Sequence, residues 1–297
     1  MNQSGGDNRP LIGMIGGSGL YNMEGLTDTQ WIRVESPFGE PSDELLFGEI
    51  DGNRIVFLPR HGRGHKLPPS QINYRANIDA LKRAGVTDIL SFSAVGSLRE
   101  DLPPGAFMIV DQFIDRTFAR KKSFFGEGLA AHVAVAHPTC PRLGDALESA
   151  AGDTVAVRRG GTYIAIEGPQ FSTLAESNLY RQWGCDVIGM TNMPEAKLAR
   201  EAEICYSTMA MVTDYDTWHP DHDSVTVEMV IKVLSANAQN AAALARRAVP
   251  GLQDRPDACP NGCDSALDTA IITAPSARDP KMVARLGAVA GRVLRAD

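Results

Sequence analysis

The sequence predicts an α/β fold, in which a single domain surrounds a mixed central β-sheet flanked by helices. Short apolar runs alternate along the chain with amphipathic stretches, which is the pattern of strands that alternate with helices. Asp51-Gly52-Asn53 separates two such runs and is a hairpin signal, so at least one strand pair is antiparallel. The 297 residues contain no internal repeat and no clear interdomain linker.

The elements of the first half follow from turn and capping signals. Pro68-Pro69-Ser70 starts a helix that Ser70 caps and Gly85 ends. The apolar run at 11–15 leads into Gly16-Gly17-Ser18-Gly19, and the run at 86–92 leads into small residues. Strands are expected at 11–15, 45–50, 54–58 and 86–92.

In the second half, Thr173 and Glu176 form a capping box for a helix that runs through Trp183. Pro194 suits a first helical turn and precedes a helix at 195–202. Strands are expected at 107–110, 162–166, 186–188 and 205–214, and further helices at 142–151, 225–248 and 280–295. We expect three regions: a flexible leader at 1–10, a catalytic domain at 11–250, and an extension at 251–297 whose terminal helix packs on that domain.

Bulk composition excludes several classes of partner. The net charge of −7 and pI near 5.4 argue against nucleic acid or an anionic membrane. No apolar run approaches the roughly 20 residues that span a bilayer. Residues 1–10 are polar and do not resemble a signal peptide, so we expect a cytoplasmic protein with reduced thiols.

The cysteines give no local metal motif. Cys140, Cys185 and Cys205 are scattered, and we expect buried structural thiols. Cys259 and Cys263 bracket Pro260-Asn261-Gly262, a spacing that suits a disulfide or half of a metal site. No matching Cys or His pair lies nearby in sequence, so we expect no metal.

Two carboxylates at a strand end are the strongest chemical signal. Asp214 and Asp216 follow an almost uncharged run and, by strand alternation, point the same way. Acids at the rim of an apolar strand are costly unless a ligand or donor meets them, although surface loops also carry acidic pairs for solubility.

Several other polar segments follow apolar strands. Gly16-Gly17-Ser18-Gly19 suits an anion, but Asn22 breaks the dinucleotide fingerprint and no P-loop lysine is present, so a tight turn remains the alternative. Arg60 and His61 offer hydrogen-bond donors for an oxyanion. The alternative interpretation is a basic loop that only contacts solvent. The further segments are Ser93-Ala94-Val95-Gly96-Ser97, Glu167-Gly168-Pro169-Gln170-Phe171-Ser172 and Gly189-Met190-Thr191-Asn192-Met193-Pro194-Glu195. Together they favour transfer of a sugar from a base to phosphate.

These motifs in combination resemble the trimeric purine nucleoside phosphorylases, from about residue 12 to 249. The segments that carry the resemblance include Asn73-Tyr74-Arg75-Ala76-Asn77, Asp111-Gln112-Phe113-Ile114-Asp115 and Thr213-Asp214-Tyr215-Asp216, besides the glycine-rich, basic and methionine-containing loops above. The resemblance implies a nucleoside phosphorylase-like fold and a homotrimer. His132 or His137 is the candidate to complete a neighbour's pocket.

The resemblance also implies roles for individual residues. Asp214 would stabilise the proton on N7 of the departing base, and Asp216 would contact the exocyclic amine. Phe171 would stack near the purine and Met190 would lie against the ribose. The remaining positions would bind phosphate (Ser18, Arg60, His61, Ser93, Ala94 and Thr191) or adapt the pocket to adenine and the 5′-methylthio group (Ser172 and Val227).

The implied reaction is phosphate-dependent cleavage of 5′-methylthioadenosine to adenine and 5-methylthioribose 1-phosphate, a step of purine and methionine salvage. Phosphate is a co-substrate, and no metal or organic cofactor is required. Members that act on 6-oxopurines carry Asn where Asp214 stands, so the Asp favours a 6-aminopurine. Gly189 departs from the family, because related sequences often have Asn there. The alternatives are a phosphorylase for 6-oxopurine nucleosides or 5′-methylthioinosine, and a nucleoside-binding regulator without turnover.

Overall fold

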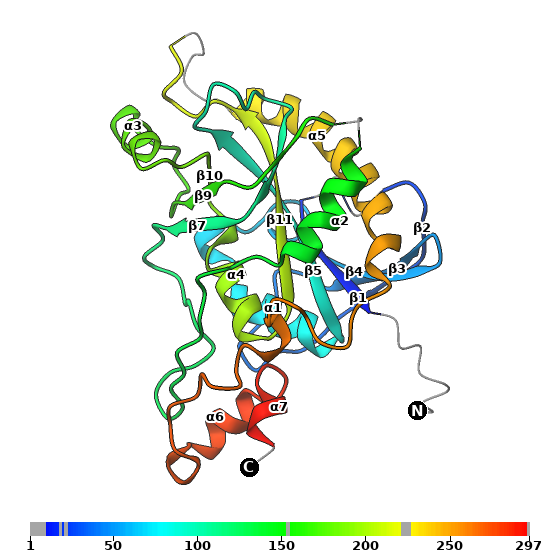
Figure 1. Cartoon of the computed structure of the whole chain (residues 1–297), viewed down its shortest axis with the longest axis vertical. Helices are drawn as coiled ribbons and strands as arrows, with labels where there is room; N and C mark the ends of the chain where they lie inside the picture. Colours follow the sequence, from blue (N-terminus) through cyan, green and yellow to red (C-terminus); the bar gives the residue numbers. More distant parts are fainter. Residues whose placement is uncertain (1–9, 18–19, 21–22, 153–154, 221–226, 296–297) are drawn as a thin grey trace.

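The computed structural model describes residues 10–17, 20, 23–152, 155–220 and 227–295, with only the backbone described at 227–232. It has an 11-stranded mixed sheet with helices on both faces (Figure 1). One path through the sheet has the strand order β2-β3-β4-β1-β5-β10-β9-β7, and β11 joins β5 to β6, which pairs with β8. The predicted fold class is therefore confirmed.

Parallel pairing sets the direction of the central strands. β1 lies between β4 and β5 and is parallel to both, and β5 is also parallel to β11. The predicted hairpin at Asp51-Gly52-Asn53 joins β3 and β4. The strands are β1 (Leu11–Gly16), β2 (Leu26–Ile32), β3 (Leu45–Ile50), β4 (Asn53–Pro59), β5 (Val86–Ser97), β6 (Phe107–Val110), β7 (Gln112–Asp115), β8 (Val157–Arg159), β9 (Thr162–Ala165), β10 (Val187–Gly189) and β11 (Cys205–Asp214).

Helices cover the sheet in two pairs. α1 packs with α4 on one face, and α2 packs with α5 on the other (Figure 1). The helices are α1 (Tyr74–Arg83), α2 (Pro141–Ala151), α3 (Leu174–Gln182), α4 (Asn192–Glu201), α5 (Val227–Ala248), α6 (Pro280–Arg285) and α7 (Gly291–Leu294), and the short 3₁₀ turns are η1 (Pro69–Gln71), η2 (Pro250–Leu252), η3 (Cys263–Ser265) and η4 (Pro275–Ala277).

Alternation along β11 divides the core between these two faces. Tyr206 and Ala210 belong to the cluster under α1 and α4, whereas Met209 and Met211 belong to the cluster under α2 and α5. All four side chains are buried, and full burial of a large apolar side chain is worth about 1.5–3 kcal/mol. Because both faces are covered, the strand is uncharged as far as Thr213 and shows no alternation of apolar and charged residues.

Three element predictions were wrong in detail. Asn73 caps α1 by accepting from the Ala76 amide, while Ser70 donates to the carbonyl of Glu167. The expected terminal helix is split into α6 and α7 around Gly287, a residue that costs about 1 kcal/mol inside a helix. β5 extends through Ser97 because β11 and β10 supply hydrogen-bonding partners there, so the segment expected as a loop is strand.

The C-terminal segment contributes to the same core as the sheet. Leu267, Leu286, Val289 and Ala290 are buried in the cluster that contains α1 and α4. Glu203, which follows α4, accepts a hydrogen bond from the Leu267 amide and pairs with Arg292. The domain boundaries expected from the sequence stay a prediction. No helix among the described residues is long and apolar enough to cross a membrane.

Candidate active site

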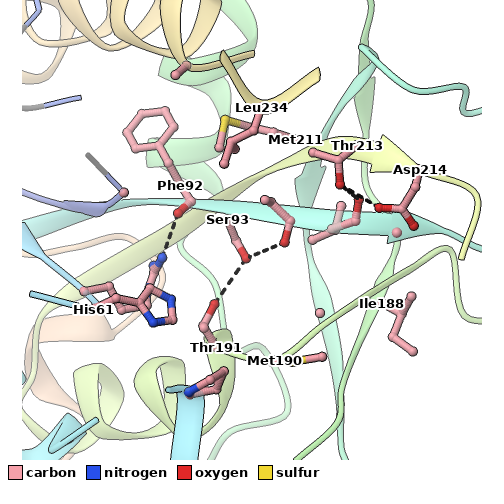
Figure 2. A pocket seen from close by; sticks show the side chains of 18 of the residues that line it. His61, Phe92, Ser93, Ile188, Met190, Thr191, Met211, Thr213, Asp214 and Leu234 are labelled. Carbon is pink, nitrogen blue, oxygen red and sulfur yellow. Dashed lines mark hydrogen bonds between the residues drawn. The ribbon is translucent and has the colours of Figure 1, made fainter. Parts of the chain in front are cut away.

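A cavity of about 670 Å³ opens at the carboxyl ends of β1, β4, β5 and β11, where ligands bind in α/β sheets (Figure 2). The fold brings together residues that the sequence places up to 222 positions apart, from Gly17 to Gln239. The sequence-predicted residues that line it are Arg60, His61, Ser93, Ala94, Phe171, Ser172, Met190, Thr191, Asp214 and Asp216. Ser18 and the Val227 side chain lie outside the described residues.

Part of the wall is apolar and was not predicted. Leu20, Phe92, Met211, Leu234 and Ala238 line the cavity, and Figure 2 shows Leu234 and Met211 beside one another. Leu234 and Ala238 come from α5, one turn apart, so the helix presents one side to the cavity. The sequence identified this helix by its periodicity but carried no signal for which strand ends it would cover.

The two carboxylates line the cavity, although they are not alternate residues of one strand. β11 ends at Asp214, and Asp216 lies in the following turn with a φ of 52°. Gly96 on β5 fits against both, because a Cβ there would lie 2.9 Å from Asp214 Oδ1 and 3.2 Å from Asp216 Cβ. The two carboxylates therefore line one cavity, but strand alternation is not the reason, because Asp216 lies outside β11.

Burial disfavours ionisation of both groups. It raises the pKa of Asp214, against hydrogen bonds that Oδ2 accepts from the Thr213 hydroxyl at 2.7 Å and Oδ1 from the Asp216 amide at 2.8 Å. It raises the pKa of Asp216 to about 6, where the nearby Ser177 and Ser172 hydroxyls and the Thr217 amide oppose the rise and Asp214 adds to it. Among the described residues, Asp216 Oδ2 and Ser172 Oγ are buried without a hydrogen-bond partner. Such atoms suit a polar ligand.

Arg60 is held by a buried acid that the sequence did not reveal as its partner. Its Nε donates to Glu195 Oε2 at 2.8 Å, and its Nη2 donates to Glu195 Oε1 at 2.9 Å and to Ser91 Oγ at 2.6 Å. Its Nη1 donates to the Phe92 carbonyl at 2.8 Å. The planar fork therefore faces Glu195, and only the second hydrogen of Nη1 is left for a ligand.

His61 is an uncharged residue beside this arginine. Burial lowers the pKa of His61 to about 4, so the ring is neutral near pH 7. Its Nδ1 lies 2.8 Å from the carbonyl of Leu67, which assigns the ring proton to Nδ1. Nε2 then carries a lone pair and accepts rather than donates. His65 stacks on the ring with centroids 4.1 Å apart.

Small hydroxyls from two elements meet at the polar side of the cavity. Ser93 Oγ lies 3.2 Å from Thr191 Oγ1 (Figure 2). It also lies 3.3 Å from the Tyr163 hydroxyl. Gly17 lines the same cavity, and a Cβ there would meet nothing within 4 Å, so its backbone is open to a ligand. The cavity thus offers hydroxyls and backbone amides of the kind that surround oxyanions.

Tyr163 explains why position 189 is glycine. A Cβ at Gly189 would lie 2.0 Å from the Tyr163 hydroxyl, which occupies the space that a side chain would need. The Tyr163 hydroxyl in turn accepts from the Thr191 amide at 3.5 Å. Related sequences often have Asn at this position, whereas here the buried Tyr163 on β9 fills the space beside Gly189.

The loop that carries Met190 is fixed by Arg120, which sequence reasoning missed as a positioning residue. Arg120 Nη1 donates to the carbonyls of Met190 and Met193, both at 2.6 Å, and Nη2 donates to the carbonyl of Glu167 at 2.8 Å. Phe171 lies at the mouth of the cavity with 44% of its surface exposed.

Comparisons with known proteins agree with this geometry. The model of the Phosphorylase superfamily matches residues 11–250. The S-methyl-5′-thioadenosine phosphorylase of Rhodospirillum rubrum is 65% identical over 287 residues, which cover 96% of this chain and 98% of the relative. The protein of that name from Cereibacter sphaeroides is 60% identical over 97% of this chain and 99% of its own length.

Solved structures show the same likeness. A methylthioadenosine phosphorylase from an Antarctic soil metagenomic library has a TM-score of 0.89 and 47% identity, covering 95% of this chain and 99% of its own. Methylthioadenosine phosphorylase from Schistosoma mansoni in complex with adenine has a TM-score of 0.77 and 35% identity, over 82% of this chain and 92% of its own.

Proposed function

This chain belongs to the phosphorylase superfamily, and we propose that it cleaves 5′-methylthioadenosine with phosphate to adenine and 5-methylthioribose 1-phosphate. One observation carries the proposal: a cavity of about 670 Å³ holds a carboxylate pair, an oxyanion-type polar side and an apolar wall. These are the surfaces that a base, a phosphate and a methylthio group require.

The carboxylate side suits adenine. Asp216 Oδ2 has no partner among the described residues and is placed to accept from the exocyclic amine. Asp214, with its raised pKa, is placed to give a proton to N7. Ser172, whose buried hydroxyl is also unpartnered within the described chain, adds a group that can donate or accept. Phe171 at the mouth offers its ring to the purine face.

The polar side suits hydrogen phosphate. Ser93 and Thr191 supply hydroxyl donors, Ala94 and Gly17 supply backbone near the cavity, and Arg60 supplies positive charge and one N–H. His61 is neutral, with a lone pair on Nε2, so we assign it the role of accepting the phosphate O–H. This differs from the donor role that the basic sequence cluster suggested.

The apolar wall suits the 5′ end of the substrate. Phe92, Met211 and Leu234 line the cavity away from the carboxylates, and Met190 lies between the two polar sides, where the ribose would sit (Figure 2). Burying a methyl-sized group is worth about 0.8 kcal/mol, so such a wall prefers a methylthio group to a hydrated hydroxyl.

The reaction balances with these groups alone. The C1′–N9 bond breaks and its electron pair stays with the purine, which takes a proton from Asp214 at N7 and leaves as neutral adenine. General acid help of this kind is worth roughly 10²–10⁴-fold. A phosphate oxygen attacks C1′ from the face opposite the base, which inverts the configuration. Hydrogen phosphate loses its proton when the sugar phosphate forms, and this proton replaces the one that Asp214 gave to adenine.

A substrate panel tests the proposal. Purified protein is incubated with methylthioadenosine, methylthioinosine and inosine, each with and without phosphate, and the free base is measured by chromatography. We expect adenine from methylthioadenosine only when phosphate is present. Equal release without phosphate would identify a hydrolase, preference for inosine would identify a 6-oxopurine enzyme, and nucleoside binding without any release would identify a regulator.

We also propose a homotrimer. Phe118 is 81% exposed and Leu174, Leu179 and Trp183 are exposed on or beside α3, which stands at the periphery of the fold (Figure 1). Exposed apolar groups of this size favour a protein partner. Sedimentation should give three times the mass of one chain, and a fully active monomer would contradict the proposal. The use of His132 or His137 by a neighbouring chain, and the cytoplasmic location, stay predictions.

A further inference from the structure

Four of the five cysteines converge at the end of the sheet opposite the cavity. Cys140 is the N-cap of α2, Cys205 begins β11, Cys263 begins η3, and Cys259 lies four residues earlier. Their sulfur atoms all lie within 4.8 Å of one another, and all four residues are buried. Cys185 is buried elsewhere. The sequence separates the members by as many as 123 positions, so only the fold reveals the group.

The spacing of the sulfur atoms fits a tetrahedral metal centre. A zinc ion bound by four thiolates has Zn–S bonds of about 2.3 Å, which places neighbouring sulfurs about 3.8 Å apart. Cys140 Sγ and Cys259 Sγ lie 3.8 Å apart. A disulfide requires about 2.05 Å and joins sulfurs in pairs, whereas this group brings all four together.

Charged and polar side chains surround the four sulfur atoms, where a metal–thiolate centre would carry negative charge. Four thiolates and a divalent ion carry two negative charges, which burial penalises unless cations lie close. Arg142 and Arg255 lie close enough to Cys205 to interact with its sulfur electrostatically, and each also pairs with the buried carboxylate of Asp88. Arg255 also pairs with Asp264, whose Oδ2 accepts from the Cys259 amide at 2.7 Å. Groups that orient ligands in this way are typical of the surroundings of metal sites.

We propose that Cys140, Cys205, Cys259 and Cys263 form a tetrathiolate zinc site that fastens the C-terminal segment to β11 and α2. The spacing of Cys259 and Cys263 already suggested half of this motif, and the other half comes from distant elements. All four positions are filled by protein ligands, so the site is structural rather than catalytic. Cys205 and Asp214 stand at opposite ends of β11, about 30 Å apart at about 3.3 Å per residue.

The first test uses the full-length native sequence. Protein is reduced, equilibrated with zinc, and passed over a desalting column with a weak chelator before metal analysis. We expect one zinc per chain and, after exchange with cobalt, the charge-transfer absorption of cobalt thiolates. No retained zinc together with five freely alkylated thiols would overturn the proposal. Disulfides among the four cysteines that re-form in the presence of zinc would overturn it too.

The second test uses variants. Cys263→Ser should reduce retained zinc to background and lower the melting temperature, whereas the matched Cys185→Ser variant, which alters a buried thiol outside the group, should retain zinc fully. If Cys263→Ser does not fold, the cobalt spectrum of the native protein decides. The initial phosphorolysis rate of Cys263→Ser at low temperature should stay near that of the native protein. An equal zinc content in both variants would refute the assignment.

Discussion

Replacing Asp216 by Asn should stabilise the protein while impairing the proposed reaction. The side chain is buried, only 4% of the residue is exposed, and Oδ2 has no hydrogen-bond partner within the described residues. Burial raises its pKa from the usual 3.8 to about 6. At about 1.4 kcal/mol for each pH unit, the ionised form costs about 3 kcal/mol of folding free energy near pH 7. An amide of the same shape avoids that cost.

The sign of the effect follows from linkage. Because the folded pKa is higher than the unfolded pKa, the unfolded state loses its proton first as pH rises. The native protein therefore loses stability from this group between about pH 4 and pH 6, and the loss is complete above that range. The stability gain of Asp216→Asn should be near zero at about pH 4, grow through pH 6, and stay constant above it.

Chemical denaturation across this pH range, at fixed protein concentration, measures the gain. Asp101→Asn is the control, because Arg99 holds the pKa of this exposed carboxyl at about 2 and its contribution is constant above about pH 5. Activity on methylthioadenosine should fall roughly tenfold or more, since the exocyclic amine loses an acceptor. A stability difference that is the same at every pH, or a destabilised variant, would refute the account of this site.

Three further predictions follow from the same geometry. Asp214→Asn should lose activity on methylthioadenosine and gain on inosine, because an amide can donate to a carbonyl at C6; equal loss on both substrates in kinetic assays would make Asp214 a catalyst but not a selector. Arg60→Ala should raise the KM for phosphate and destabilise the fold by about 3–5 kcal/mol by leaving buried Glu195 unpaired; adding Glu195→Gln should recover the melting temperature but not the KM. Gly189→Ala should cost about 1–3 kcal/mol, since its Cβ would overlap the Tyr163 hydroxyl, and an unchanged melting temperature would contradict that contact.

Local sequence signals predicted most elements because each depends on a few neighbouring residues. The Thr173–Glu176 capping box forms as expected, with the Thr173 hydroxyl accepting from the Glu176 amide at 3.2 Å. The hairpin at Asp51-Gly52-Asn53 also forms. The end of β5 was misjudged, since small residues that resemble a loop remain in strand when both neighbours supply hydrogen bonds.

The candidate site was predictable where function requires particular polar groups directly after a strand. Arg60 directly follows β4, Asp214 is the last residue of β11 and Thr191 lies two residues beyond β10, and each lines the cavity. The partners of those groups were not predictable. Glu195 is 135 positions from Arg60, and its role as the ion-pair partner depends on how α4 packs against α1 and β11.

The sequence by itself determined the fold class, the family and the identity of the polar groups, because these follow from periodicity, turn chemistry and motif residues that are close together along the chain. Only the tertiary structure decided which of those groups are neutral, paired or free. Burial makes His61 neutral and an acceptor at Nε2 rather than the expected donor. Arg60 donates four of its five N–H groups to Glu195, Ser91 and the Phe92 carbonyl, and the sulfur atoms of four distant cysteines lie within 4.8 Å of one another. Burial and contact between distant segments set these properties, and neither is encoded in any short stretch of the chain.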